Sequence, residues 1–348
     1  MASTSASYLA TTTTFTSNLL EIKQNPFFPN TFTDFFHPFF SPGNLNNSKL
    51  FKFPKMTLSN DYVGIGSFNS TRTNYNTPYS GNFYKRMDSC LVIPPPKGTK
   101  PKAIIKFVGG AFIGAVPEVS YSYLLENLAR KGYLIICVPY NVTFDHAQVT
   151  RQVFERFHAC FDSILASGLL DVGLSAADIV DLPLYSVGHS NGALIQALVG
   201  SYFCEKIPKA NVIISYNNRP ASEAVPYFEQ LAQGISEFKP KPSENLECFK
   251  NAYNVKRTLL VKFDLDSIDE TDRLEETLKP RVESFGGKVE KIALTGNHIT
   301  PCIQEPKWQV GAVYTPADAV AQVVKTMSLN DTKGLCTTIV NWFSSLEE

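Results

Sequence analysis

The chain has no excess charge of either sign. Its 348 residues include 32 Lys and Arg against 32 Asp and Glu, so the formal net charge is zero. A protein that binds nucleic acid must neutralise phosphates with a basic face, and this balance argues against such a partner.

Long apolar runs and patterned cysteines are also missing. No uninterrupted apolar run reaches the roughly 18 residues that a membrane-spanning helix needs. The seven cysteines are scattered, and several lie in apolar, strand-like runs such as "LIICVPY". An odd, unpatterned set is typical of reduced core residues, whereas a disulfide framework or a zinc site would show regular spacings.

Acidic residues are absent from the first twenty positions. The stretch "MASTSASYLATTTTFTSNLL" has ten Ser or Thr, and the first acid is Glu21. It lacks the apolar segment of a secretory signal, and its hydroxyl-rich, Arg-poor composition favours a transit peptide for plastids over one for mitochondria. A disordered tail without a targeting role is the alternative. We assign residues 1–56 to this leader and expect the mature protein in a plastid, in the stroma.

From Asp88 onward, short apolar runs alternate with segments of helix length. Strands are expected at 89–95, 101–110, 133–141, 181–190, 210–217, 257–264 and 288–296. Helices are expected at 120–133, 146–168, 191–203, 270–287 (with an interruption at its Pro-Arg pair) and from 318 onward. Nearly continuous apolar strands alternating with helices predict an α/β fold, with a mostly parallel, doubly wound sheet covered on both faces. Residues 57–348 are assigned to this single domain.

Ser190 lies between an expected strand and an expected helix, at the centre of "GHSNG". Ligands of open parallel sheets gather at such carboxyl ends of strands. A turn this sharp brings the two backbones almost into contact, so Gly188 and Gly192 supply the room that it needs, with His189 between them and the serine. The turn exposes the serine hydroxyl and places the Asn191 amide where it can donate to a developing oxyanion. The stretch therefore predicts that Ser190 is a nucleophile.

A serine nucleophile needs a general base. Three of the five histidines lie in the leader, inside an expected helix or in the turn itself, and His146 precedes the serine in the chain. His298, in "ALTGNHITP", follows the last expected strand, where a loop overhangs the sheet edge. We therefore expect His298 to be the base, with an ordinary polar loop residue as the alternative.

The base in turn needs a carboxylate that fixes its tautomer. The stretch "LLVKFDLDSIDE" offers three aspartates just past a strand, and Asp266, in the turn itself, is the preferred one. Asp264 is the second candidate. Capping the following helix is the expected role of Asp269 or Asp272.

The order Ser, Asp, His at strand ends resembles the α/β-hydrolase superfamily, from about residue 88 to the C-terminus. This resemblance implies a sheet of the α/β-hydrolase type and a second oxyanion donor from the loop "FVGGAFIG". The loop is similar to the His-Gly-Gly-Gly loop of esterases, with Val108 in place of the His, and the donor would be the amide of Gly110, Ala111 or Phe112. More narrowly, "GGAFIGAVPEVSYSYLLENLA", "GHSNGALIQAL" and "SYNNRPASEAVP" resemble an uncharacterised family of α/β-hydrolase-like proteins of plastids and cyanobacteria.

Nucleotide-binding loops are not indicated. No Lys-Ser or Lys-Thr pair follows Gly114, and "VGIGSF" at 63–68 lacks the third glycine of a dinucleotide fingerprint. We expect no cofactor and no metal.

Residues 217–254 lie between two expected strands, where hydrolases commonly insert a small cap. Four apolar residues in this segment have helical spacing: Val225, Phe228, Leu231 and Ile235. Together with Phe112 and Ile113 they would form an apolar lid over an acyl pocket. A helix packed on the core is the alternative.

These residues predict a serine hydrolase of the carboxylesterase or thioesterase type, acting on an apolar acyl ester or thioester through an acyl-enzyme at Ser190. The expected partner is a small acyl substrate, and the oligomeric state is left open. Two alternatives remain: an acyltransferase that uses the same triad, and a non-catalytic binding or assembly protein on a hydrolase scaffold.

Overall fold

The computed structural model describes residues 84–224, 237–302 and 316–346, and for residues 316–328 it describes the backbone alone. The expected leader, 1–56, and the four apolar positions of the candidate lid, 225–235, lie outside these ranges. The leader, its plastid address and the lid therefore stay predictions.

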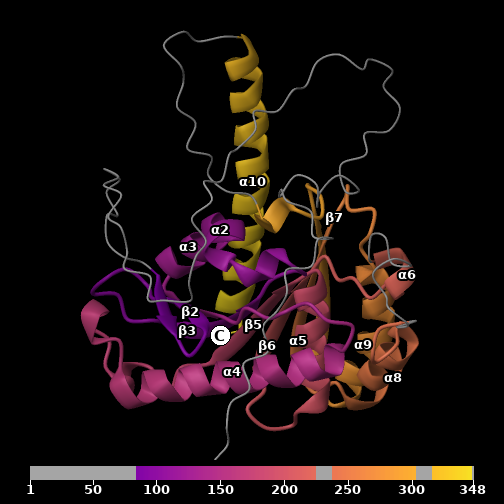
Figure 1. Ribbon diagram of the computed structural model, residues 1–348, viewed down its shortest axis with the longest axis horizontal. Helices are drawn as coiled ribbons and strands as arrows, with labels where there is room; N and C mark the ends of the chain where they lie inside the picture. The colour runs from indigo at the N-terminus through magenta and orange to yellow at the C-terminus, as the bar shows by residue number, and fades with distance from the viewer. Residues whose placement is uncertain (1–83, 225–236, 303–315, 347–348) are drawn as a thin grey trace, which may run out of the picture. The chain divides into compact units, whose positions relative to one another are not determined.

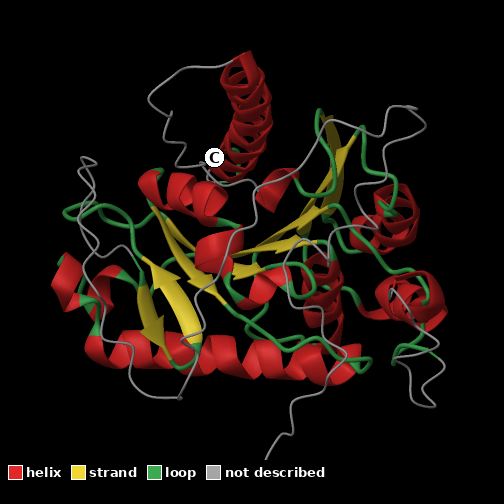
Figure 2. Cartoon of the chain, turned by 45° about the horizontal axis from the view of Figure 1, so that its top comes forward, coloured by secondary structure: helices red, strands yellow, loops and turns green. Residues whose placement is uncertain are grey.

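One eight-stranded sheet forms the centre of the described residues (Figure 2). The strands are Lys85–Met87 (β1), Cys90–Ile93 (β2), Ala103–Val108 (β3), Tyr133–Cys137 (β4), Leu184–His189 (β5), Ala210–Ile214 (β6), Arg257–Phe263 (β7) and Lys288–Leu294 (β8). Their order is β1-β2-β4-β3-β5-β6-β7-β8. β2 is antiparallel to both of its neighbours, and β3 to β8 run parallel. The predicted mostly parallel, doubly wound sheet is confirmed.

Helices cover both faces of the sheet (Figure 1). One face packs against His146–Ser167 (α4), Asn191–Tyr202 (α5), Pro242–Ala252 (α8) and Thr271–Ser284 (α9). The other packs against Ser122–Arg130 (α3) and Pro316–Ser344 (α10). Short helices lie at Ile113–Ala115 (η2), Pro117–Ser120 (α2), Leu170–Val172 (η3), Ala176–Asp178 (η4), Ala221–Ala224 (α6) and Thr300–Cys302 (η5).

The continuous apolar strands follow from this two-sided burial. In β4, Tyr133, Ile135 and Cys137 belong to the core beneath α3 and α10, while Leu134 and Ile136 belong to the core beneath α4 and α5. Successive side chains of a strand point to opposite faces, so both sets must be apolar.

The longest helix with fully described side chains, α4, shows how helices cover the sheet. Its buried apolar residues recur every three or four positions: Val149, Val153, Phe157, Cys160 and Ile164. The Asp145 carboxylate accepts a hydrogen bond from the Gln148 amide at its start, and Gly168, with φ of 65°, ends it. Both are ordinary helix caps, Asp145 at the N-terminus and Gly168 at the C-terminus.

Three elements of the sheet and its covering helices differ from the sequence prediction. β1 was not expected, because "KRM" has no apolar run and is held at the edge by β2. α8 was not expected as a helix, and it lies within the candidate cap segment 217–254. α9 continues through Pro280, contrary to the expected interruption. Pro280 and Glu276, whose carbonyl loses its helical donor, are both exposed, so water can satisfy that carbonyl.

All seven cysteines are free thiols, and Cys90, Cys137, Cys160 and Cys336 are buried. None of the helices in the described ranges combines the length and the apolarity that a membrane span requires.

Candidate active site

The turn between β5 and α5 holds Ser190 in a strained backbone conformation, with φ of 57° and ψ of −122°. A Cβ added at Gly188 would lie 2.6 Å from the Gly192 carbonyl oxygen. A Cβ at Gly192 would lie 2.2 Å from the Val108 carbonyl oxygen and 2.3 Å from that of Gly109. Such distances exclude any side chain. Gly188 is therefore needed for β5 to lie against the start of α5, and Gly192 for α5 to lie against the end of β3.

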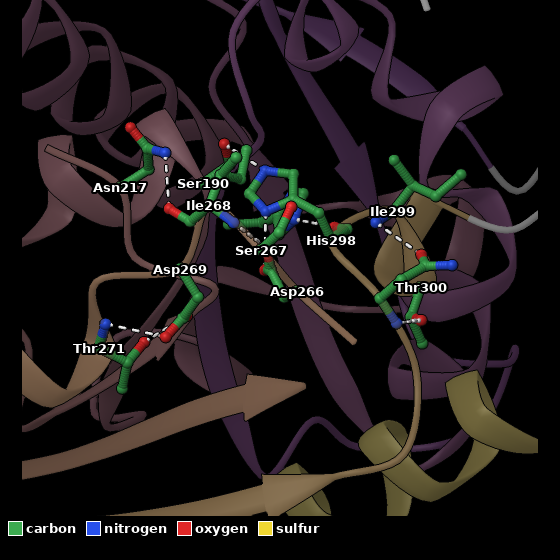
Figure 3. Close-up of polar contacts among 12 residues, drawn as sticks. Ser190, Asn217, Asp266, Ser267, Ile268, Asp269, Thr271, His298, Ile299 and Thr300 are labelled. Carbon is green, nitrogen blue, oxygen red and sulfur yellow. Dashed lines mark hydrogen bonds and ion pairs between the residues drawn. The ribbon is translucent and has the colours of Figure 1, made fainter. Parts of the chain in front are cut away.

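Ser190, His298 and Asp266 lie together in one hydrogen-bonded row (Figure 3). His298 Nε2 is 2.9 Å from Ser190 Oγ, and His298 Nδ1 is 2.8 Å from Asp266 Oδ2. They follow β5, β8 and β7, which are parallel strands, so all three come from the same edge of the sheet. The Asp266 side chain is fully buried, and that of His298 is 17% exposed.

The surroundings of Asp266 favour its ionised form. Burial by itself raises the pKa of the carboxyl, but the hydrogen bond and charge of His298 lower it, assisted by the Ile268 amide. The net effect is a pKa below the usual value. The Ile268 N–H donates to Asp266 Oδ1 at 3.1 Å, so both carboxylate oxygens have partners.

The other acids of this segment bind elsewhere. Asp264 is exposed and accepts the Gly296 N–H at 3.0 Å. Asp269 accepts from the backbone amide and hydroxyl of Thr271, at the start of α9. Asp272 pairs with two lysines of the neighbouring strands. Of the three candidates in the turn, Asp266 is the one that contacts His298.

The loop after β3 passes directly beside Ser190. A Cβ added at Gly110 would lie 3.3 Å from Ser190 Cβ. The Gly110 N–H donates to the Tyr121 hydroxyl at 2.8 Å, which engages one of the three expected oxyanion donors. The Ala111 N–H donates to no acceptor in the part of the chain that the structure describes. Phe112 has φ of 62° and precedes η2.

Asn191, which carries another of the expected oxyanion amides, follows Ser190 directly. It is the first residue of α5, so its N–H has no acceptor within the helix. Its side chain is fixed from two directions: the Tyr140 hydroxyl donates to Oδ1 at 2.8 Å, and Nδ2 donates to His146 Nε2 at 3.2 Å. Burial lowers the pKa of His146 to about 4, which leaves the ring neutral and able to accept this bond.

Sequence reasoning missed Tyr121 and Tyr140 altogether. Both hydroxyls reach the site from the segments between regular elements, at 2.8 Å from His189 Nδ1 and from Asn191 Oδ1 respectively. The direction of a side chain in a turn leaves no periodic signal in the sequence. Among the described residues, no three His, Cys, Asp or Glu side chains gather as a metal site would require.

Residues 84–345 match the model of a protein family described as "Protein of unknown function (DUF1350)". The chain belongs to this family. No curated protein matches it.

Three solved structures illustrate the similarity of this family member to known folds. The "Thioesterase Domain From Curacin Biosynthetic Pathway" is 13% identical with a TM-score of 0.38, covering 71% of this chain and 98% of that one. Est1E from Butyrivibrio proteoclasticus is 15% identical with a TM-score of 0.39, covering 71% and 97%. Carboxyl esterase 2 from Tuber melanosporum is 18% identical with a TM-score of 0.41, covering 74% and 89%. At these identities the similarity concerns the fold alone.

Proposed function

We propose that this protein is a serine hydrolase that cleaves an ester or thioester through an acyl-enzyme at Ser190. One observation carries the proposal: His298 bridges the Ser190 hydroxyl and the buried Asp266 carboxylate at 2.9 and 2.8 Å. A serine hydroxyl is a weak nucleophile until a base accepts its proton, and an oriented histidine is the group that does so.

The reaction begins with attack of Ser190 Oγ on the carbonyl carbon. Its proton passes to His298 Nε2, while Asp266 holds the Nδ1–H and stabilises the imidazolium that forms. The backbone amides of Asn191, which follows Ser190 in the chain, and of Ala111, which follows Gly110, would donate to the oxyanion. His298 then protonates the leaving alcohol or thiol, which leaves the acyl group on Ser190.

Water completes the cycle in the second half. His298 takes a proton from a water molecule, which attacks the acyl carbon, and the oxyanion forms and collapses as before. The acid is released, and His298 returns the proton to Ser190 Oγ. An alcohol in place of water would make the protein an acyltransferase, so the ratio of acid to transferred ester separates these two reactions.

The substrate that we propose carries an apolar acyl group. Two large apolar side chains are exposed in the segments that carry the site: Phe112, 48% exposed in the loop after β3, and Leu265, 75% exposed and next to Asp266 in the chain. Exposed apolar residues close in sequence to a site favour an apolar ligand.

Labelling of the full-length chain with a fluorophosphonate tests this proposal without knowledge of the substrate. The wild type should become labelled at Ser190, as located by peptide mass spectrometry, and Ser190→Ala and His298→Ala should not. His158→Ala, in α4 away from the site, is the matched control and should label like the wild type. An unlabelled wild type, under conditions that label a known serine esterase, would favour the non-catalytic scaffold.

A further inference from the structure

A second histidine, His189, lies fully buried beside the hydrogen-bonded row of Ser190, His298 and Asp266. It and Tyr121 are both 0% exposed, and neither takes part in the steps described above. His189 Nδ1 lies 2.8 Å from the Tyr121 hydroxyl oxygen, and its Nε2 lies 2.8 Å from the backbone carbonyl oxygen of His298. One imidazole thus joins the turn before α3 to the backbone of the proposed base.

The backbone carbonyl of His298 determines which His189 nitrogen carries the proton. A carbonyl oxygen only accepts, so His189 Nε2 carries the hydrogen and donates it to His298. Burial lowers the pKa of His189 to about 3, so the ring is neutral at pH 7 and its Nδ1 accepts. The Tyr121 hydroxyl donates to that Nδ1, in preference to the longer 3.9 Å contact of the Cys302 thiol.

The tyrosine oxygen has a second partner in the oxyanion loop. It accepts the Gly110 N–H at 2.8 Å. Three hydrogen bonds therefore run without a break from Gly110 through Tyr121 and His189 to His298. Each bond has one donor and one acceptor, so removal of a single side chain leaves buried groups unpaired on both sides.

The tyrosine ring also supports the loop by contact. A Cβ added at Gly109 would lie 2.7 Å from Tyr121 Cε2, and the Phe107 ring packs edge-on against the same ring, 4.9 Å between centroids. Because the loop rests on this ring and passes beside Ser190, a shift of Tyr121 would displace the neighbouring Ala111 amide.

We infer that Tyr121 and His189 are positioning residues, which hold the oxyanion loop and the backbone of His298 at the distances that Ser190 requires. This inference rests on the proposed function, because the alignment matters for turnover only if Ser190 is the nucleophile. Catalytic geometry is demanding: a misplacement of about 1 Å costs on the order of 10²-fold in rate.

Tyr121→Phe tests the first of the two residues. The measurements are the second-order rate constant for fluorophosphonate labelling, and kcat and KM for p-nitrophenyl butyrate. We expect the labelling constant and kcat to fall about 10- to 100-fold, with KM within about threefold of the wild type. The control is Tyr253→Phe, an equally buried hydroxyl that bonds Asn211 and Thr258 in the core. Its labelling constant and its kcat should stay within about twofold of those of the wild type.

His189 is tested by two replacements that differ in one hydrogen bond. The amide nitrogen of Gln can reach the place of His189 Nε2 and still donate to His298, whereas Leu cannot. His189→Gln should therefore label within about tenfold of the wild type, and His189→Leu should fall about 100-fold or more. The double variant Tyr121→Phe/His189→Leu should be no worse than His189→Leu, because both changes break the same series of bonds.

The outcomes separate this inference from the proposed function. If the wild type labels at Ser190 but Tyr121→Phe labels at the same rate, the positioning role is refuted and the hydrolase proposal stands. Equal losses in Tyr121→Phe and Tyr253→Phe would also refute it, because the effect would then follow from lost stability. An unlabelled wild type would remove the proposed function and this inference together.

Discussion

Two carboxylates in the turn after β7 are two residues apart and have different partners. The Asp266 side chain is buried and forms a hydrogen bond with His298 Nδ1, whereas Asp264 is exposed and accepts a hydrogen bond from the Gly296 amide. The buried acid can orient a base and stabilise its charge, whereas the exposed one only closes a turn.

Substitution to Asn separates these two roles. Asp266→Asn should lower kcat about 10⁴-fold, because the amide disturbs the tautomer of His298 while Ser190 stays in place. Asp264→Asn keeps an oxygen that can accept from Gly296, so its kcat should remain within a few-fold of the wild type. Steady-state kinetics on p-nitrophenyl butyrate, with circular dichroism to verify folding, measures both. A collapse of the rate in Asp264→Asn with an active Asp266→Asn would reverse the assignment.

That Ser190, His298 and Asp266 lie together could be predicted because each follows a strand, and parallel strands end at one edge. The hydrogen-bonding partners around them could not. Nothing in "SYSYLLENLA" indicates that the Tyr121 hydroxyl turns back to Gly110, and this bond removes the Gly110 amide from the expected oxyanion donors. Such contacts depend on how turns orient side chains, and sequence periodicity does not encode that orientation.

The close approach of α5 to β3 has a direct consequence for Gly192. A Cβ there would meet two carbonyl oxygens at 2.2 and 2.3 Å, and both belong to backbone that cannot move without shifting β3. Gly334, in α10, is exposed, and a Cβ at that residue would have nothing within 4 Å.

The two glycines should therefore respond to Ala in opposite directions. Gly192→Ala should lower the free energy of unfolding by about 3 kcal/mol and abolish labelling of Ser190, because the turn must shift to admit the methyl group. Gly334→Ala should raise the free energy of unfolding by about 1 kcal/mol, as expected for glycine in an exposed helix interior. Urea denaturation measures both. An unchanged midpoint for Gly192→Ala would contradict the close packing of the turn between β5 and α5.

The elements that the sequence predicts well are those whose own residues dictate them. Central strands such as β4 are apolar at every position because both faces are buried. β1 is a strand because β2 pairs with it, and no pattern within its three residues requires that conformation. α8 was missed for a related reason: it lies in a segment rich in Pro and Glu, where the apolar positions are few.

A row of polar side chains crosses the buried sheet. Lys106, Ser186, Asn211 and Thr258 are register neighbours on β3, β5, β6 and β7. The last three are linked by hydrogen bonds, directly or through the Tyr253 hydroxyl. Lys106 is 1% exposed, forms no ion pair with any carboxylate of the described residues, and lies 5.4 Å from the Phe157 ring centroid.

Lys106 should make the stability of the fold depend on pH. Burial lowers the pKa of its amine to about 7, far below the value of an unfolded chain. Between pH 7 and pH 10 the unfolded chain therefore binds a proton that the folded chain has released. The free energy of unfolding should rise with pH in this window, by at most about 1.4 kcal/mol per pH unit from this group. Below pH 7 the amine is protonated in both states, and the full free-energy cost of burying its charge remains.

Lys106→Met removes this penalty with a side chain of similar length. The variant should be more stable than the wild type at pH 7, and its advantage should shrink by about 2 kcal/mol between pH 7 and pH 9, because the wild type loses its buried charge over that range. Lys250→Met, on the exposed side of α8, is the control and should show no such change with pH. Urea denaturation at the two pH values measures both variants. An advantage of Lys106→Met that stays constant from pH 7 to pH 9 would mean that the folded protein keeps this amine protonated throughout.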